Sequence, residues 1–295
     1  MLRLRRRVAF LVWLVFAMPS AGRAQQSINP QDAVRPSQPN PLISEADAHY
    51  ARRQDGRVGA LAGGREIALA IAGYDSAARA PDNAEARWKL ARALYFKAAY
   101  TGLDEAGQKA VYDKARLAGE QAIAIVERRV RNPMPFDSKH DPDAAPSYFW
   151  AAVAWGRWAL ATGKIEAASK GAAEKVRDYA NVVIGLDPAF EDGGGFRVLG
   201  RLHDQAPWIP FVTASASRDE AVRNLRMAMK MEPHSLINRL FLAEALASGN
   251  AAEKAEAILL AQSVVADSPS PARLVEELKI QSDAREDLKK WKPAP

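Results

Sequence analysis

Two prolines in this chain, Pro81 and Pro233, are each followed by the same three apolar residues at the same distances. A leucine stands nine residues after each proline, an alanine ten and a second leucine thirteen. These residues are Leu90, Ala91 and Leu94 after the first proline, and Leu242, Ala243 and Leu246 after the second. Proline ends one helix, and a small residue further on lets the next helix approach its neighbour closely. The repeat therefore predicts an all-α fold of stacked helical hairpins.

The first 24 residues have the layout of a secretory signal. Four arginines between positions 3 and 7 precede an apolar run over residues 8–18, and the small residues Gly22 and Ala24 follow. The apolar run is shorter than a helix that spans a bilayer comfortably. We therefore expect residues 1–24 to be a signal peptide and the protein to be periplasmic or otherwise exported. The alternative is an uncleaved signal that anchors the chain in the inner membrane.

Removal of that signal changes the charge of the chain. The full sequence has 41 lysines and arginines against 35 acidic residues, and five of the arginines lie in residues 1–24. The other 36 basic residues nearly balance the 35 acidic ones, so a net charge of +1 offers no general attraction to nucleic acid. The chain has no cysteine, which excludes disulfides, thiolate metal sites and the lipid-bearing cysteine of a lipoprotein.

Beyond the signal, the chain divides into a leader and a helical region. Residues 25–43 are rich in proline and lack hydrophobic periodicity, which is typical of a flexible leader. Helical patterning covers residues 44–292, which we expect to form a single helical-repeat domain. The predicted helices include Ala84–Tyr100, 104–131, a segment that opens after Pro146, 165–186, 196–205, Arg218–Met231, 235–247, 252–266 and 271–290. The last is amphipathic and should cap the stack, because a terminal repeat needs a polar outer face.

Further positions agree between the hairpins. Gly156 lies ten residues after Pro146, as the two alanines do after their prolines. Small or apolar residues also stand five, eight and twelve residues before both Pro188 and Pro233. These are the packing positions of a tetratricopeptide repeat. The sequence thus predicts a tetratricopeptide-repeat-like α-solenoid with a C-terminal capping helix.

One stretch carries a more specific likeness. Residues 191–202 read EDGGGFRVLGRL. Together with residues 206–207, 217–219, 228–233 and 238–246, this stretch resembles the periplasmic T component of TRAP-type transporters, most strongly over about residues 175–270. The resemblance implies a helical protein with a cavity or pore, which associates with an extracytoplasmic solute-binding subunit and handles small, often hydrophobic ligands. Members of that family are commonly lipoproteins, and this chain lacks the cysteine for it.

In such repeats, the position just after the small packing residue faces the concave side. It is occupied here by Arg92, Arg157 and Arg201, and by Glu244 in the fourth hairpin. Stacked arginines can hold a carboxylate, since guanidinium donates paired hydrogen bonds to its oxygens. Nearby aromatic residues would supply apolar walls for such a ligand. Alternatively, the arginines lie on solvated helix faces and the aromatic residues belong to the core. The candidate ligand-binding residues are Arg92, Arg157, Arg197, Arg201, Trp88, Tyr95, Phe96 and Trp150.

Three consecutive glycines, Gly193, Gly194 and Gly195, open the third hairpin. The small residue Gly200 lies twelve residues after Pro188, as though the glycines add two positions. A phosphate cradle is one interpretation, but no strand precedes the glycines and no Lys-Ser/Thr pair follows, which excludes a P-loop. We expect a structural role in a tight turn or a close backbone contact, with a place on a pocket rim as the second interpretation.

The loop after this helix is unusually apolar. Its residues Trp208, Ile209 and Phe211 form either a partner or ligand surface or part of the core. The four histidines are scattered along the chain, and neither a catalytic zinc site nor a Ser-His-Asp arrangement is recognisable. We therefore expect no cofactor, no metal and no catalytic residue, and a protein that is not an enzyme.

Two functions remain open on this basis. The first is an exported protein that binds or channels a small apolar organic acid as an accessory of a TRAP-type uptake system, in contact with a solute-binding subunit. The second is a general envelope scaffold that holds peptides or protein helices of another envelope protein in its concave groove. An enclosed cavity favours the first function and an open trough favours the second. A homo-oligomer is compatible with both.

Overall fold

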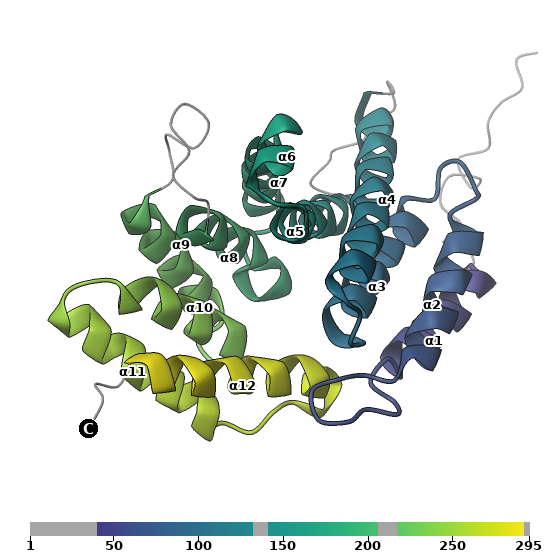
Figure 1. The fold of residues 1–295 in the computed structure, drawn as a ribbon. Helices are drawn as coiled ribbons and strands as arrows, with labels where there is room; N and C mark the ends of the chain where they lie inside the picture. The colour runs from purple at the N-terminus through teal and green to yellow at the C-terminus, as the bar shows by residue number, and fades with distance from the viewer. Residues whose placement is uncertain (1–39, 132–140, 206–216, 292–295) are drawn as a thin grey trace, which may run out of the picture. The chain divides into compact units, whose positions relative to one another are not determined.

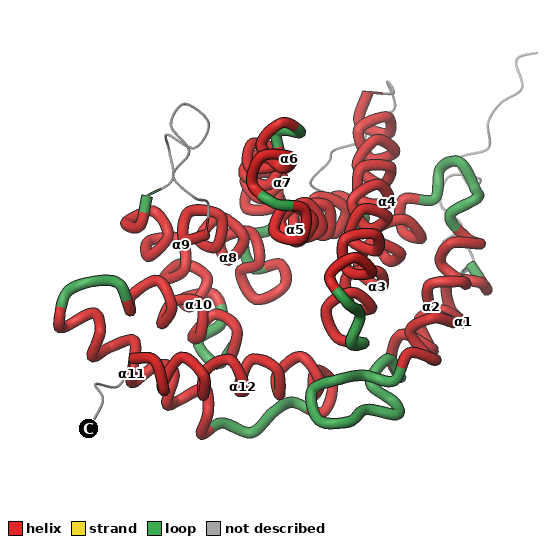
Figure 2. The backbone as a smooth tube through the Cα atoms, viewed as in Figure 1, coloured by secondary structure: helices red, strands yellow, loops and turns green. Residues whose placement is uncertain are grey.

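Helices account for the regular structure of the described part of the chain (Figures 1 and 2). A computed structural model describes residues 40–131, 141–205 and 217–291, all within one compact unit, Pro39–Pro295. Apart from an isolated bridge between Val58 and Leu61, no β-structure occurs in these ranges, so the predicted all-α class is confirmed. The predicted signal peptide and residues 25–39 of the predicted leader lie outside the described residues.

The helices follow the predicted hairpins. Both ends of α3 (Ala84–Tyr100) and of α9 (Arg218–Met231) are those expected from the sequence. None of the helices in the described ranges is long and apolar enough to cross a membrane. The other helices are α1 (Pro41–Ala51), α2 (Gly64–Ala77), α4 (Glu105–Arg131), α5 (Ala144–Thr162), α6 (Lys164–Ser169), α7 (Ala172–Leu186), α8 (Phe190–Gln205), α10 (Leu236–Ala247), α11 (Ala251–Ala266), the 3-10 helix η2 (Pro271–Arg273) and α12 (Leu274–Trp291).

Asparagine side chains cap the starts of several helices. Asn40 and Asn83 each accept a hydrogen bond of 3.0 Å from a backbone N–H of the first turn, and Asn250 forms a capping box with Glu253. Asn40 is followed by Pro41, whose fixed φ suits the first helical position. The first helix therefore begins at Pro41, two residues before the predicted end of the leader at residue 43.

The predicted helix over residues 165–186 is two helices instead. Gly171 adopts a left-handed conformation, with φ 64° and ψ 35°, and separates α6 from α7. Glycine occupies this conformation without the steric cost that a Cβ would bring. The hydrophobic periodicity continues through Gly171, so the sequence pattern does not indicate that the helix breaks there.

A left-handed turn opens α8. Three consecutive residues have positive φ: Glu191 at 49°, Asp192 at 62° and Gly193 at 76°. A residue with a side chain costs about 1–2 kcal/mol in this conformation. The two acidic residues therefore store strain that contacts elsewhere must offset. The turn lies in the stretch where this hairpin departs from the proline spacing of the others.

Neighbouring helices pack in pairs. The pairs are α1–α2, α3–α4, α5–α7, α8–α9 and α10–α11, and α12 packs against α10 and α11 (Figure 1). The first helices of successive pairs also touch at α3–α5, α5–α8 and α8–α10. The small residues of the predicted repeat are buried where helices meet: Ala91 and Ala243 are fully buried, and Gly200 of α8 is buried against Leu225 of α9. Small side chains there let the helix axes approach closely.

Replacing Gly200 with alanine should destabilise the protein. A Cβ at this position would lie 2.4 Å from Cγ of Leu225 and 3.2 Å from the backbone oxygen of Ala221. Overpacking of this kind costs about 1–3 kcal/mol, which urea denaturation would measure as a lower free energy of unfolding. Gly185 is the matched control, because it is helical and exposed and has no atom within 4 Å of a built Cβ. Gly185→Ala should stabilise by up to about 1 kcal/mol. Equal effects of the two substitutions would contradict the close approach.

Candidate functional site

A cavity of about 860 Å³ lies within the helical unit. Its walls come from α1, α3, α5, α8 and α10, which are the first helices of the pairs, and from α6, α7, η2 and α12. The second helices α2, α4, α9 and α11 contribute no residue to the wall. One helix of each pair therefore faces the cavity, except in the α5–α7 pair, where both do, and the C-terminal helix faces it too.

Seven of the eight candidate residues line this cavity. They are Arg92, Arg157, Arg197, Arg201, Tyr95, Phe96 and Trp150. Trp88 does not line it, because its indole N–H donates a hydrogen bond of 3.0 Å to the carboxylate of Asp143 at the start of α5. Glu244 also lies outside the lining.

Arg157 lies in the cavity wall, where its side chain is accessible from the cavity and surrounded by protein atoms. Its Nε–H donates to the hydroxyl of Tyr112 at 3.3 Å, and it forms no ion pair with a carboxylate of the described residues. Burial lowers the pKa of Arg157, but the phenol oxygens of Tyr95, Tyr112 and Tyr100 outweigh burial and leave that pKa above its usual value. The guanidinium is therefore a stable cation among tyrosines.

The tyrosines around Arg157 remain protonated donors. Burial raises the pKa of Tyr100 and of Tyr112 above the usual value for a phenol. The hydroxyls of Tyr95 and Tyr100 lie 3.5 Å apart, and the ring of Tyr95 lies 5.7 Å from that of Trp150. A guanidinium beside phenol donors and aromatic rings can bind a carboxylate through its charge and an apolar body through its walls.

Arg201 differs because its charge is compensated. It pairs with Glu244 and, at 3.0 Å, with Asp204, and its guanidinium lies 4.0 Å from the ring centre of Phe241. Burial raises the pKa of both Glu244 and Asp204, and the positive charge of Arg201 opposes that rise. Two partly buried carboxylates therefore share this one guanidinium, which leaves it less able to bind an anion.

The charge of Arg92 is compensated less than that of Arg201 and more than that of Arg157. Its guanidinium stacks 4.0 Å from the ring centre of Tyr50, and its closest carboxylate, that of Asp47, is 4.0 Å away. Asp47 lies closer to Lys89, at 2.6 Å. The charge of Arg92 is therefore only partly compensated.

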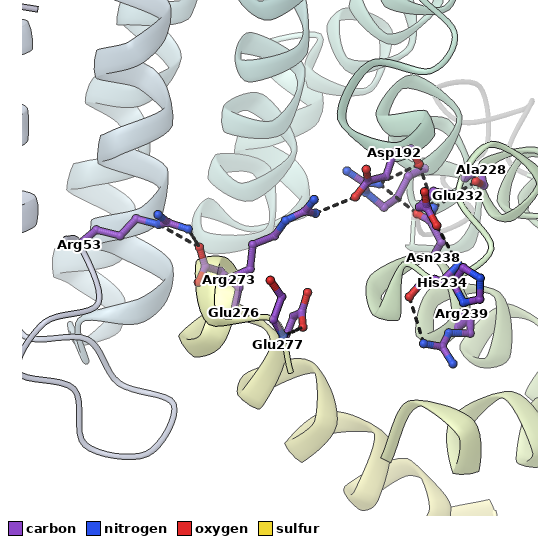
Figure 3. Close-up of polar contacts among 12 residues, drawn as sticks. Arg53, Asp192, Ala228, Glu232, His234, Asn238, Arg239, Arg273, Glu276 and Glu277 are labelled. Atoms are coloured by element: carbon purple, nitrogen blue, oxygen red, sulfur yellow. Dashed lines mark hydrogen bonds and ion pairs between the residues drawn. The ribbon is translucent and has the colours of Figure 1, made fainter. Parts of the chain in front are cut away.

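Arg197 belongs to a buried polar network around Asn238. Arg197 is 9% exposed and donates a hydrogen bond of 3.0 Å to Oδ1 of the fully buried Asn238. Nδ2 of Asn238 donates in turn to the backbone oxygens of Asp192 and Ala228, at 2.8 and 3.0 Å (Figure 3). Burial lowers the pKa of Arg197, and the charges of Glu191 and Asp192 oppose that shift. Asn238 thus holds both a cavity arginine and the strained turn of α8.

The glycine run packs against neighbouring helices. A Cβ built on Gly194 would lie 2.5 Å from the ring of Phe149, and one built on Gly195 would lie 2.7 Å from Cγ1 of Ile184. Gly193 has the positive φ of the turn. None of the three lines the cavity. Close contact and the turn account for these glycines without a ligand.

Other cavity residues had no sequence signal. Repeat spacing cannot indicate Arg53, which follows α1, or Arg273 and Glu276 near the start of α12, because these segments occupy no repeat position. Tyr50 in α1 and Tyr100 at the end of α3 also line the cavity without having been predicted. The predicted apolar surface of Trp208, Ile209 and Phe211 lies outside the described residues.

No protein-family model matches this chain, and a search of curated proteins finds no match either. Within the described ranges, no group of three or more histidine or acidic side chains is placed to hold a metal ion. The chemistry that defines the site is that of the Arg157 guanidinium without a carboxylate partner among the described residues, phenol donors and aromatic walls.

Substitution of Asn238 should be costly. Asn238→Ala removes the donor to two backbone oxygens and the acceptor of Arg197, all in a buried position. Unsatisfied buried groups of this kind should lower the free energy of unfolding by about 2–4 kcal/mol in urea denaturation. Asn224→Ala is the control: Asn224 makes one hydrogen bond within α9, to the backbone of Glu220, and its loss should cost less than about 0.5 kcal/mol. Similar midpoints for both variants would show that the network contributes little.

Proposed function

We propose that this chain is an exported, tetratricopeptide-repeat-like protein that binds or channels a small apolar organic acid as an accessory of a TRAP-type solute uptake system. The export part of the proposal rests on residues 1–24, and the transport part rests on the resemblance over about residues 175–270. The binding part rests on the cavity and its charged groups.

The observation that carries the binding proposal is the environment of Arg157. This guanidinium lies in the cavity wall with tyrosine hydroxyls around it and no carboxylate of the described residues paired with it. A partly desolvated cation without a counterion favours an anionic guest, because the guest compensates the charge. A carboxylate also matches the planar donor fork of guanidinium. Arg157 is therefore the proposed head-group anchor.

The rest of the cavity suits an apolar body. Its volume of about 860 Å³ lies within the range of small-molecule sites. Phe96, Phe149, Trp150, Leu202 and Phe241 are among its lining residues. Aromatic and aliphatic walls together with one cationic group, Arg157, favour an amphiphilic acid over a fully polar solute.

The scaffold function requires an open trough for an extended peptide or helix. Here Glu276 of α12 pairs with Arg53 beside α1 at 2.7 Å. Val275 of α12 is fully buried in one cluster with residues of α1, α2 and α3. The first and last helices thus bound the same cavity, which favours a small guest over a peptide.

Calorimetry with 2-naphthoate tests the anchor. The protein should bind this acid more tightly than neutral 2-naphthamide, and Arg157→Gln should weaken binding of the acid at least about tenfold, because a charge-assisted hydrogen bond is lost. Binding of the amide should not change. Since guanidinium and naphthoate both stay charged from about pH 6 to 9, the affinity should be flat over that range.

The control is Arg226→Gln. Arg226 lies on α9, outside the cavity, and pairs with Glu256 at 2.8 Å. This variant should bind 2-naphthoate as the unmodified protein does. Equal binding of acid and amide to all three proteins would refute the anchor role of Arg157.

The transport part has its own test. The chain without residues 1–24 should form a complex with a TRAP-type solute-binding subunit of the same organism, measured by analytical ultracentrifugation. The same experiment reports whether the chain forms homo-oligomers. A chain that pairs with no such subunit, and carries no small molecule in native mass spectrometry, would contradict the proposal.

A further inference from the structure

One side chain is missing from the row that α5 presents to the cavity. The lining residues of this helix include Trp150, Val153, Gly156 and Leu160, which recur every three or four residues and so share one side of the helix. Trp150, Val153 and Leu160 carry large side chains, and Gly156 carries none. The space between Val153 and Leu160 at Gly156 is called the notch below, and it lies one residue before the proposed anchor Arg157.

Helix packing does not explain this glycine. In the sequence repeat, Gly156 stands at the position of Ala91 and Ala243, which are fully buried. Apart from its chain neighbours and its own helix backbone, a Cβ built on Gly156 would have one atom of the described residues within 4 Å. That atom is Cγ2 of Val176, at an ordinary contact distance of 3.9 Å, in contrast to the crowding found at Gly200. An alanine would therefore fit at position 156.

Backbone conformation does not explain the glycine either. Gly156 lies inside α5 and its φ is not positive, whereas Gly163, just beyond the end of the helix, has a φ of 97°. Inside a helix, glycine is less favourable than alanine because it loses more conformational entropy on folding. The chain thus carries a destabilising residue here that neither packing nor backbone geometry requires.

The surroundings of the notch are apolar. Val176 of α7, the neighbour of Gly156, belongs to an apolar cluster with Ala172 of the same helix. Val198 and Leu202 of α8 pack against this cluster, and all four of these apolar residues line the cavity. An apolar group of a guest gains more from such a wall than water does.

The notch and the anchor lie close enough for one guest to reach both. Gly156 and Arg157 are adjacent, and successive residues of a helix are turned by about 100° around its axis. Arg157 reaches toward Tyr112 of α4, whereas Gly156 faces Val176 of α7. A guest whose carboxylate meets the guanidinium can therefore extend its apolar body across α5 over Gly156.

We propose that Gly156 sets the size of the guest, because the notch accepts a part of the apolar body that a side chain at this position would displace. The acidic head group of that guest rests on the proposed function, but the notch acts on the apolar body alone. Two fused rings cover more of this wall than a single ring does, and the gain in binding grows with the apolar area buried. The guest class that follows is an acid with a body wider than one ring.

Two substitutions that fill the notch test this inference by calorimetry. Gly156→Ala should weaken binding of 2-naphthoate about two- to fivefold and Gly156→Leu at least about tenfold, because the added atoms occupy space that the second ring needs. Binding of 2-naphthamide should fall by the same factors, since its rings are the same. Binding of benzoate should change by less than about twofold, because one ring can avoid the notch.

The urea midpoint of unfolding separates this role from a packing role. Gly156→Ala should raise the midpoint, because alanine is the better helix former, whereas a glycine needed for helix contact would make the same substitution lower it. Gly185→Ala and Gly185→Leu are the matched controls, since Gly185 is helical, exposed and outside the cavity lining. Both should leave binding of 2-naphthoate unchanged. If circular dichroism shows that Gly156→Leu is misfolded, the alanine variant carries the test.

The outcomes distinguish the notch from the anchor. Unchanged binding of both naphthyl compounds to the Gly156 variants, or a lower urea midpoint of Gly156→Ala, overturns the notch even if Arg157→Gln weakens binding of the acid. Weaker binding of both compounds with an undiminished midpoint supports the notch even if Arg157→Gln has no effect, a result that rejects the anchor alone. An unmodified protein that binds neither compound overturns both.

Discussion

Close approach of helices at small residues is the constraint on which the other features depend. Ala91, Gly200 and Ala243 are buried where helices meet, and a larger side chain at these positions would push the helices apart. Once the small residue faces the neighbouring helix, the next residue is turned about 100° around the axis. That rotation carries Arg92 and Arg201 to the cavity side. The position of the arginines is thus a consequence of helix packing.

Placement in the same cavity does not make the arginines equivalent. Arg201 shares its charge with Glu244 and Asp204, and Arg92 competes with a lysine for one carboxylate, whereas Arg157 has tyrosine hydroxyls around it. Phenols stabilise a cation by hydrogen bonding and polarity without neutralising it. Arg157 therefore keeps a net charge that a guest can compensate, and the ability to bind an anion depends on each arginine's partners.

Local signals in the sequence predicted much of the helical pattern, because proline and capping residues act within a turn of where they stand. Both ends of α9 follow from such signals. The left-handed Asp192 does not, since it is held by Asn238, 46 residues away. Nor does the orientation of Trp88, which is decided by a carboxylate on another helix, that of Asp143. Periodicity indicates which side of a helix is buried, but it does not identify the partner of a polar side chain.

The same limit applies to α12, expected from its amphipathic pattern to be a cap with a polar outer face. It packs on α10 and α11, and polar residues at its start also meet two other parts of the chain; the pair of Glu276 with Arg53 joins residues 223 positions apart. Val275 of the same helix is buried among residues of α1, α2 and α3, and the side chains of Arg53 and Glu276 are only 11% and 18% exposed. Apolar burial and a largely buried ion pair therefore join the last helix to the first ones, and such a pair is costly to break because each charge would lose its partner in a partly dry environment. The start of α12 is thus a fixed part of the cavity wall, although repeat spacing cannot predict it, because its partners lie at the other end of the sequence.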